Sequence, residues 1–173
     1  QVQKITTFQQ VENQIARLER TLKQEIDKDL EAARQDTSDT QSRSRGLLNA
    51  LQQVTGGNSF EFETFRTWSL QKDSSEQVGE YLDKLFHKAE ILIFDLEQIE
   101  AGLELADMLA SSGIDRNITA KTLLLEAYVH EELLNDQQQA EEYYNRLSSE
   151  YGDTETALEY FAEEQTEPEA AEE

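Results

Sequence analysis

The sequence contains no cysteine and has only two histidines, one proline and seven glycines. Without cysteine there are no disulfides, thiolate metal sites or cysteine nucleophiles, and two histidines are too few for a histidine-rich metal site. So little glycine and proline argues against a loop-rich β fold and a glycine-rich phosphate cradle. No serine-hydrolase, nucleotide-loop or kinase signature occurs. We therefore expect no enzyme, no catalytic residues, no cofactor and no bound metal.

Long apolar runs and positive charge are scarce as well. No run approaches the roughly 20 apolar residues that span a bilayer, and the longest candidate, 89–96, is interrupted by Glu90 and Asp95. The 37 acidic residues outnumber 15 basic ones, for a formal net charge of −22. This balance argues against direct nucleic-acid binding and against an anionic membrane surface. The chain opens at Gln1 rather than Met, which suggests a processed or excised chain, and cytoplasm and bacterial cell envelope are both compatible with it.

The acidic excess is confined to the later part of the chain. Residues 1–50 hold eight basic and eight acidic side chains, whereas residues 51–173 hold seven basic and 29 acidic ones. Residues 164–173 are rich in glutamate and lack large apolar side chains. We expect this acidic tail to be disordered. It would serve either as a docking tail or as a solubilising terminus.

Apolar residues recur every three or four positions near the N-terminus, namely Val2, Ile5, Phe8, Val11, Ile15, Leu18, Leu22, Ile26 and Leu30. This spacing predicts one long amphipathic helix over residues 1–34. The stripe is narrow and approaches the 3.5-residue period of a coiled coil. We expect the chain to form a homo-oligomer, or to bind a partner helix, through the centre of this stripe. The alternative is that the stripe packs on the chain's own body. The candidate partner-binding residues are Ile15, Leu18, Leu22 and Ile26.

Residues 35–57 are predicted to form a polar connector followed by a short helix. Residues 35–46 contain no large apolar side chain, so they suit a connector or a solvated stretch of continuous helix. A patch with helical spacing follows, formed by Leu47, Leu48, Leu51 and Val54, and the pair Gly56-Gly57 ends it.

Four aromatic residues are concentrated just after this connector, Phe60, Phe62, Phe65 and Trp68. Asn58 and Glu61 have the spacing of a capping box, which predicts a short helix from about 60 to 71. A strand is the alternative, because aromatic residues favour strands and Phe60 and Phe62 alternate. The aromatic side chains either anchor a partner or dock this segment on the core, and we favour the core.

The rest of the chain has helical periodicity almost throughout. Ser74 and Gln77 suggest the start of one long helix that continues to Ser111, the most apolar segment. Three further helices are predicted at about 117–135, 137–151 and 153–163. Short connections make consecutive helices antiparallel neighbours. Residues 58–163 should therefore form a bundle of antiparallel helical hairpins, and the whole protein an all-α fold.

Small and aromatic residues follow a particular order between residues 117 and 163. Ala140 stands where two antiparallel helices would touch, Tyr144 follows four residues later, and Leu147 takes a further packing position. Gly152-Asp153 forms a turn, after which the buried face continues with Ala157, Tyr160 and Phe161. In this segment the chain resembles a tetratricopeptide repeat, in which two antiparallel helices pair within about 34 residues.

The resemblance implies a helical hairpin with a possible capping helix, of the kind that offers a face or groove to another protein. Asn135 stands in place of the usual turn glycine, and the family's proline after the second helix is absent. One repeat cannot bury its own face, and about three are usually needed. No clear second copy is recognisable upstream.

Two groups of side chains carry the chemistry of a possible site. Glu126 and His130 share a helical face at a spacing of four residues, as do Asp83 and His87. Neither pair matches the spacing of a zinc protease or of a di-iron bundle. A row of carboxylates formed by Glu97, Glu100, Glu104 and Asp107 would bind calcium or raise the pKa of one member. A solvated helix face explains the row more simply, so neither group is predicted to be a metal site.

Two classes of function agree with these observations. The first is a non-catalytic protein–protein interaction or scaffold module built from helical hairpins. The alternative is an acidic mimic or chaperone that covers a basic surface of its partner, for which the −22 charge is the support. Adaptation to a salty environment would also explain the acidity and would say nothing about a partner.

Overall fold

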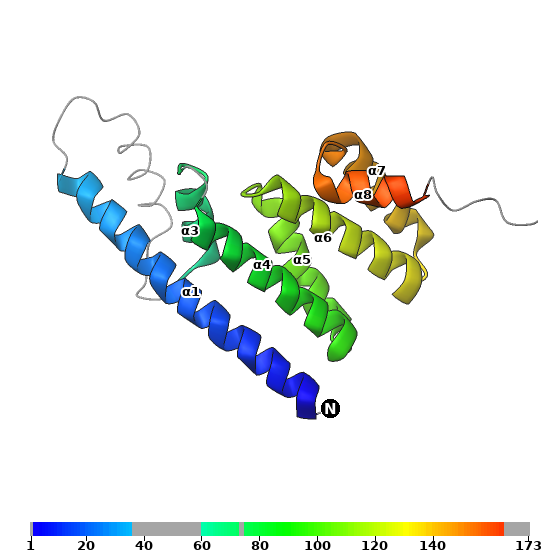
Figure 1. The fold of residues 1–173 in the computed structure, drawn as a ribbon, viewed down its shortest axis with the longest axis horizontal. Coiled ribbons are helices and arrows are strands. Elements are labelled where there is room, and N and C mark those ends of the chain that lie inside the picture. Colours follow the sequence, from blue (N-terminus) through cyan, green and yellow to red (C-terminus); the bar gives the residue numbers. More distant parts are fainter. Residues whose placement is uncertain (1, 36–59, 73–74, 165–173) are drawn as a thin grey trace, which may run out of the picture. The chain divides into compact units, whose positions relative to one another are not determined.

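The computed structural model describes residues 2–35, 60–72 and 75–164, of which 87% are helical and none lies in a strand. The all-α prediction is therefore confirmed. The predicted connector and short helix at 35–57 and the predicted tail at 164–173 lie outside the described residues, except that Gln35 ends α1 and Glu164 ends α8. No helix in the described ranges is long and apolar enough to cross a membrane. The elements are α1 (Val2–Gln35), α3 (Phe62–Ser69), α4 (Glu76–Glu90), η1 (Ile91–Asp95), α5 (Ile99–Ser112), α6 (Arg116–Tyr128), η2 (Val129–Leu133), α7 (Gln137–Tyr151) and α8 (Glu155–Glu164) (Figure 1).

The chain divides into two compact units, Gln1–Glu97 and Gln98–Glu173, which we call unit 1 and unit 2. Unit 1 contains α1, α3, α4 and the π-helical turn η1. Unit 2 contains α5, α6, the π-helical turn η2, α7 and α8. The division falls at the turn after η1, within the segment that the sequence assigned to one long helix.

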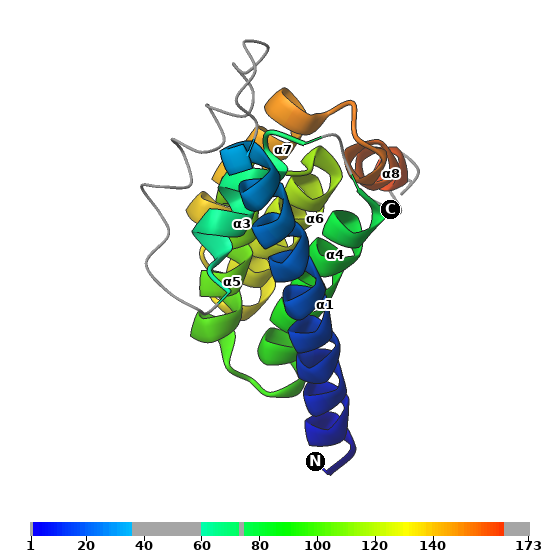
Figure 2. The same ribbon diagram turned by 90° about the vertical axis from the view of Figure 1, so that its left-hand side faces the viewer.

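In unit 1 the long helix α1 runs antiparallel to α4 (Figure 1). Residues that follow one another along α1 contact residues of α4 in the reverse order. Glu12 pairs with Lys88, and further along α1 Glu19 accepts a hydrogen bond from the Tyr81 hydroxyl at 3.0 Å. Helix α3 lies beside the C-terminal half of α1 (Figure 2). The apolar stripe of α1 is thus the face that these two helices cover.

The structure buries three of the four candidate partner-binding residues of α1. Ile15, Leu22 and Ile26 are buried, whereas Leu18 is half-buried. The helix prediction is confirmed to within two residues at its end, and α3 and α4 of the same chain cover its stripe. Binding of a partner or a second copy through these residues stays a prediction, and it would require α1 to leave this packing.

Two of the four clustered aromatic residues, Phe65 and Trp68, are fully buried in unit 1. Phe65 packs edge-on against Tyr81, with ring centroids 4.9 Å apart. The segment is a helix, as predicted, but it starts at Phe62 with Glu61 as its N-cap residue, and the Glu61 side chain makes no cap hydrogen bond. Asn58, the expected cap residue, lies outside the described residues. These aromatic side chains dock α3 on the core, as favoured above.

The prediction of one continuous helix to Ser111 is wrong. The chain leaves α4 through η1 and breaks at Glu97, whose φ of 56° lies in the left-handed region. The helix also begins later than expected, because the Ser75 side chain, and not that of Ser74, accepts the capping hydrogen bond from the Val78 N–H. Apolar spacing continues through the break, which explains why the periodicity concealed it.

Unit 2 is a series of helices joined by short turns, so that α5, α6 and α7 are successive antiparallel neighbours. Asp115 caps α6 and Asp136 caps α7, and each accepts a hydrogen bond from a backbone N–H of the first turn. Helix α8 packs on α6 and α7. The core at this end combines Ala120, Leu147 and Ala157 with the half-buried Leu124, Tyr151, Tyr160 and Phe161. The predicted boundaries of these helices agree with the structure to within a few residues.

A local backbone pattern occurs twice, at a spacing of 38 residues. The N–H of Leu96 donates to the Ile91 carbonyl at 3.0 Å, and the N–H of Leu134 donates to the Val129 carbonyl at 3.0 Å. The residue that follows each leucine has positive φ, 56° at Glu97 and 53° at Asn135, and a helix begins two residues later. A shift of 38 residues also aligns six pairs of buried positions, Leu82/Ala120, Leu85/Leu123, Ala89/Ala127, Ile91/Val129, Gly102/Ala140 and Leu109/Leu147.

Candidate functional site

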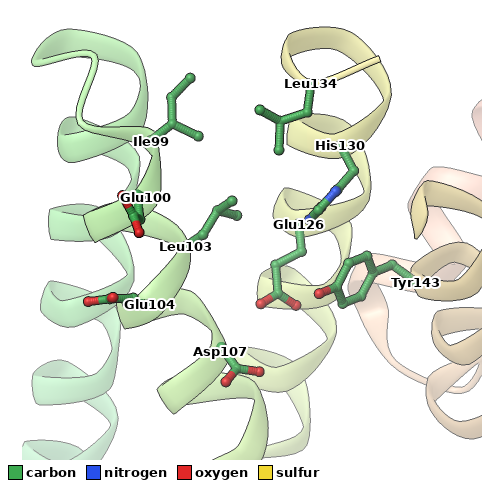
Figure 3. Close-up of a pocket in the computed structure, with 9 residues that line it drawn as sticks. All are labelled: Ile99, Glu100, Leu103, Glu104, Asp107, Glu126, His130, Leu134 and Tyr143. Carbon is green, nitrogen blue, oxygen red and sulfur yellow. The ribbon is translucent and has the colours of Figure 1, made fainter. Parts of the chain in front are cut away.

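Unit 2 contains a pocket of about 580 Å³ between α5 on one side and α6 with η2 on the other (Figure 3). Helix α7 contributes one aromatic side chain. Figure 3 shows Ile99 and Leu134 at one end of the pocket and the carboxyl groups of Glu126 and Asp107 toward the other, while Glu100 lies beside Ile99. The lining residues are Ile99, Glu100, Leu103, Glu104, Asp107, Glu126, His130, Leu134 and Tyr143.

Helical periodicity places the α5 side of this lining. Ile99, Leu103 and Asp107 are four residues apart, so they lie on one face of α5 along its length. Two apolar residues therefore precede an acidic one along the same wall. The antiparallel course of α6 brings Glu126 opposite Asp107, and the two carboxyl groups lie toward the same end of the pocket in Figure 3.

The π-helical turn η2 determines the other wall. Its wider turn includes His130 and is followed by the C-cap residue Leu134, which lines the pocket and is 44% exposed. The neighbouring Leu133 is 40% exposed but does not line the pocket. Insertions of this kind in helices are often found at functional sites, because they redirect side chains.

Glu126 is the unusual group of the pocket. It is 1% exposed, and its Oε2 has no hydrogen-bond partner among the described residues. Burial, and to a lesser extent the negative charge of Asp107, raises the pKa of Glu126 to about 8, against the opposing charge of Arg146. The carboxyl group is therefore mostly protonated at neutral pH.

Two further polar side chains face the same space. The phenol of Tyr143 points toward the Glu126 carboxyl group (Figure 3), and burial together with the charge of Glu126 raises the pKa of Tyr143. The buried Nδ1 of His130 has no hydrogen-bond partner in the described part of the chain. Its nearest acidic atom is Oδ2 of Asp136 at 3.9 Å, which is too long for a hydrogen bond.

The structure brings together part of what the sequence singled out. Glu126 and His130 line one pocket with three members of the carboxylate row, Glu100, Glu104 and Asp107. Glu97, the fourth member, lies in the turn before α5 and does not line the pocket. The pair Asp83 and His87 belongs to α4 of unit 1. Within residues 2–35, 60–72 and 75–164, no three acidic or histidine side chains are grouped so that they would hold a metal ion.

Sequence reasoning missed the apolar wall and the aromatic side chain of this pocket. Neither Leu134 nor Tyr143 belongs to a motif that can be recognised in the sequence. Their shared location depends on the turn at Asn135, which folds α7 back onto α6. The nearest signal in the sequence is the 38-residue spacing that aligns the buried positions on either side of the two turns.

Comparisons of the chain with protein-family models, with curated proteins and with solved structures gave no match. The functional argument therefore rests on the chemistry of this pocket. Its apolar wall and acidic end suit a ligand that has both an aliphatic and a positively charged part. Carboxyl groups with strongly raised pKa values occur both in acid–base catalysts and in binding sites.

Proposed function

We propose that the protein is a non-catalytic interaction or scaffold module that binds a protein partner through the pocket face of unit 2. The observation that carries the proposal is the pocket itself. It is bounded on both sides by helices, and its rim includes the exposed Leu134. Apolar groups at the rim of a pocket are typical anchoring points for a partner's side chains.

The repeated backbone pattern gives this proposal further support. Helical-hairpin repeats present extended surfaces to other proteins, and variation of a few surface residues adapts them to new partners. The proposal includes a relationship to the tetratricopeptide repeat. The 38-residue spacing departs from that family, whose repeat has about 34 residues.

The test is a selection of displayed random peptides against the full chain. Selected peptides should bind the wild type and Leu133→Ser equally and bind Leu134→Ser about tenfold more weakly, because a lost leucine contact is worth about 1.5–3 kcal/mol. The two leucines are adjacent and similarly exposed, so they form a matched pair. If every selected peptide ignores Leu134, or if no peptide is selected, the proposal fails.

A second candidate is the acidic mimic or chaperone that covers a basic surface. Residues 98–173 contain 20 acidic and three basic side chains, a formal net charge of −17, and this charge favours it. Such binding depends on long-range charge and falls steeply with added salt. A partner that loses affinity with salt but is indifferent to Leu134→Ser would support this candidate in place of the first.

A further inference from the structure

The unsatisfied carboxyl oxygen of Glu126 is the first feature of the pocket that points to a ligand. A buried polar atom without a hydrogen-bond partner costs about 1–3 kcal/mol, so proteins rarely keep one. Oε2 of Glu126 is such an atom within the described residues, and the side chain lines the pocket. A ligand that donates a hydrogen bond at this point would remove the cost.

The charge of the lining residues is the second feature of the pocket that points to a ligand. Glu100, Glu104 and Asp107 line the pocket from α5, and no lysine or arginine lines it. Arg146 of α7 acts on Glu126 electrostatically but lies outside the lining, and its Nε is 3.6 Å from a carboxylate oxygen of Glu150. The carboxyl groups along the lining, of which Asp107 lies at the same end as Glu126, therefore favour a cation.

The position of the apolar side chains along the pocket is the third feature that points to a ligand. Ile99, Leu103 and Leu134 form the apolar part of the lining, and Figure 3 shows Ile99 and Leu134 facing each other at the end away from Asp107. A group entering past these side chains meets aliphatic surface first and the carboxyl groups of Glu126 and Asp107 afterwards. Lysine and arginine have this composition, because an aliphatic stem carries a charged, donating head.

We infer that the pocket receives a lysine or arginine side chain of a protein partner, with the cationic head between Glu126 and Asp107 and the stem against Leu103 and Leu134. This inference rests on the proposed function, whose pocket face it uses. It adds the chemical identity of the anchoring residue. Charge-assisted hydrogen bonds to a carboxylate are about twice as strong as neutral ones.

Binding of a cation should be coupled to loss of a proton. The free Glu126 carboxyl group is mostly protonated at neutral pH, and a bound cation favours its ionised form. Affinity should therefore rise with pH, approaching tenfold per unit below about pH 8 and levelling off above it.

Other titratable or charged groups face Glu126 from the neighbouring elements. They are Asp107 of α5, His130 of η2, and Tyr143 and Arg146 of α7. Helix α8 packs near Ala120, toward the other end of α6. A His130→Gln variant separates the contribution of the histidine from that of Glu126.

The experiment uses the full chain and four capped pentapeptides, Gly-Ala-X-Ala-Gly, in which X is lysine, arginine, norleucine or glutamate. Binding is followed by NMR from the backbone resonances of the pocket residues, and the resonances of unit 1 report on folding. The lysine or arginine peptide should bind at least about tenfold more tightly than the norleucine peptide, whose stem has no charge. Glu126→Gln and Asp107→Asn should each remove most of this preference, whereas Glu141→Gln on the exposed face of α7 should leave it unchanged.

Each contrary outcome has its own meaning. Equal binding of the lysine and norleucine peptides, or an unchanged preference in both Glu126→Gln and Asp107→Asn, would overturn the inference. So would the absence of any shift at the pocket with all four peptides. Equal affinity for free n-butylamine and the lysine peptide would identify a small amine as the ligand and overturn the assignment to a partner protein. Dependence of the displayed peptides on Leu134 is measured separately, so the proposed function survives a pocket that prefers norleucine.

Discussion

The indole Nε1–H of Trp68 donates a hydrogen bond to Oδ2 of Asp29 at 2.9 Å and thereby joins α3 to α1. Nζ of Lys72 lies 2.7 Å from the same oxygen and 4.7 Å from the centre of the Trp68 ring. Burial alone would raise the pKa of Asp29, but the hydrogen bonds from Lys72 and Trp68 outweigh it and lower the pKa. A fully buried tryptophan thus has its one polar atom satisfied by a carboxylate that stays ionised at neutral pH.

We expect Asp29→Asn to lower the free energy of unfolding at pH 7 by roughly 1–3 kcal/mol, because a charged acceptor is lost from a buried donor. Since the pKa of Asp29 is lowered by folding, its contribution is present above the ordinary value of 3.8 and is lost as pH falls through the folded value. Urea denaturation at pH 7 and at pH 3 measures the difference. Asp27→Asn is the control, because Asp27 is exposed and pairs with Lys23 of its own helix. Equal losses in the two variants would contradict the prediction.

Leu22 is fully buried at the centre of the α1 stripe, whereas Val2 of the same helix is 82% exposed. Leu22→Ala should therefore lower the free energy of unfolding by about 2–5 kcal/mol, and Val2→Ala by less than about 0.5 kcal/mol. Chemical denaturation of both variants gives the values. A change near zero for Leu22→Ala would mean that α1 does not pack on its own chain.

The predicted self-association of α1 is decided by sedimentation of the wild type beside the fourfold variant with serine at Ile15, Leu18, Leu22 and Ile26. The packing in unit 1 gives the stripe an intramolecular cover. If the wild type sediments as a monomer and the variant loses folding stability, the helix folds back and the oligomer prediction fails. If the wild type is a dimer and the variant is a folded monomer, the stripe binds a second copy.

Periodicity predicted the helices of this protein well and its turns poorly. The apolar series with steps of three or four residues lie almost entirely in helices where the structure describes them, because burial of one face requires that spacing. The break at Glu97 could not be predicted in this way. It needs no glycine or proline, and the apolar residues Leu96 and Ile99 on either side keep a helical step. The turn between η2 and α7 was predicted correctly, because Asn135 and the cap residue Asp136 are typical of a helix boundary in the sequence.

The residues of the pocket could likewise be predicted from the sequence only in part. Pairs such as Glu126 and His130 are visible in a sequence because they are neighbours on one helix. The placement of Asp107 opposite Glu126, and of Tyr143 beside it, depends on three helices and two turns. Burial of Glu126 comes from the same packing, and in a sequence a buried glutamate looks like any exposed one.

Glu126 should make the stability of the protein fall as pH rises. Its pKa in the folded protein is about 8, against an ordinary value of 4.5, so folding favours the protonated form. This contribution is fully present below pH 4.5 and is lost as pH rises through 8, with a total effect of roughly 3–5 kcal/mol. In Glu126→Gln the decline between pH 5 and pH 8 should largely disappear, whereas it should persist in the exposed Glu141→Gln control. Parallel curves of unfolding free energy against pH in all three proteins would show that Glu126 is not the cause.

The two positive-φ turns should respond differently to glycine. A left-handed conformation costs a side-chain-bearing residue roughly 1–2 kcal/mol, and asparagine tolerates it better than glutamate. Glu97→Gly, at φ 56°, should therefore raise the free energy of unfolding by about 0.5–1 kcal/mol after the added entropy of the unfolded chain is subtracted. Asn135→Gly, at φ 53°, should change it by less than about 0.5 kcal/mol. Glu97→Ala removes the same charge but keeps the Cβ, so it should bring no gain. Urea denaturation at one pH compares the three variants, and a gain in Glu97→Ala equal to that in Glu97→Gly would assign the effect to charge and not to backbone conformation.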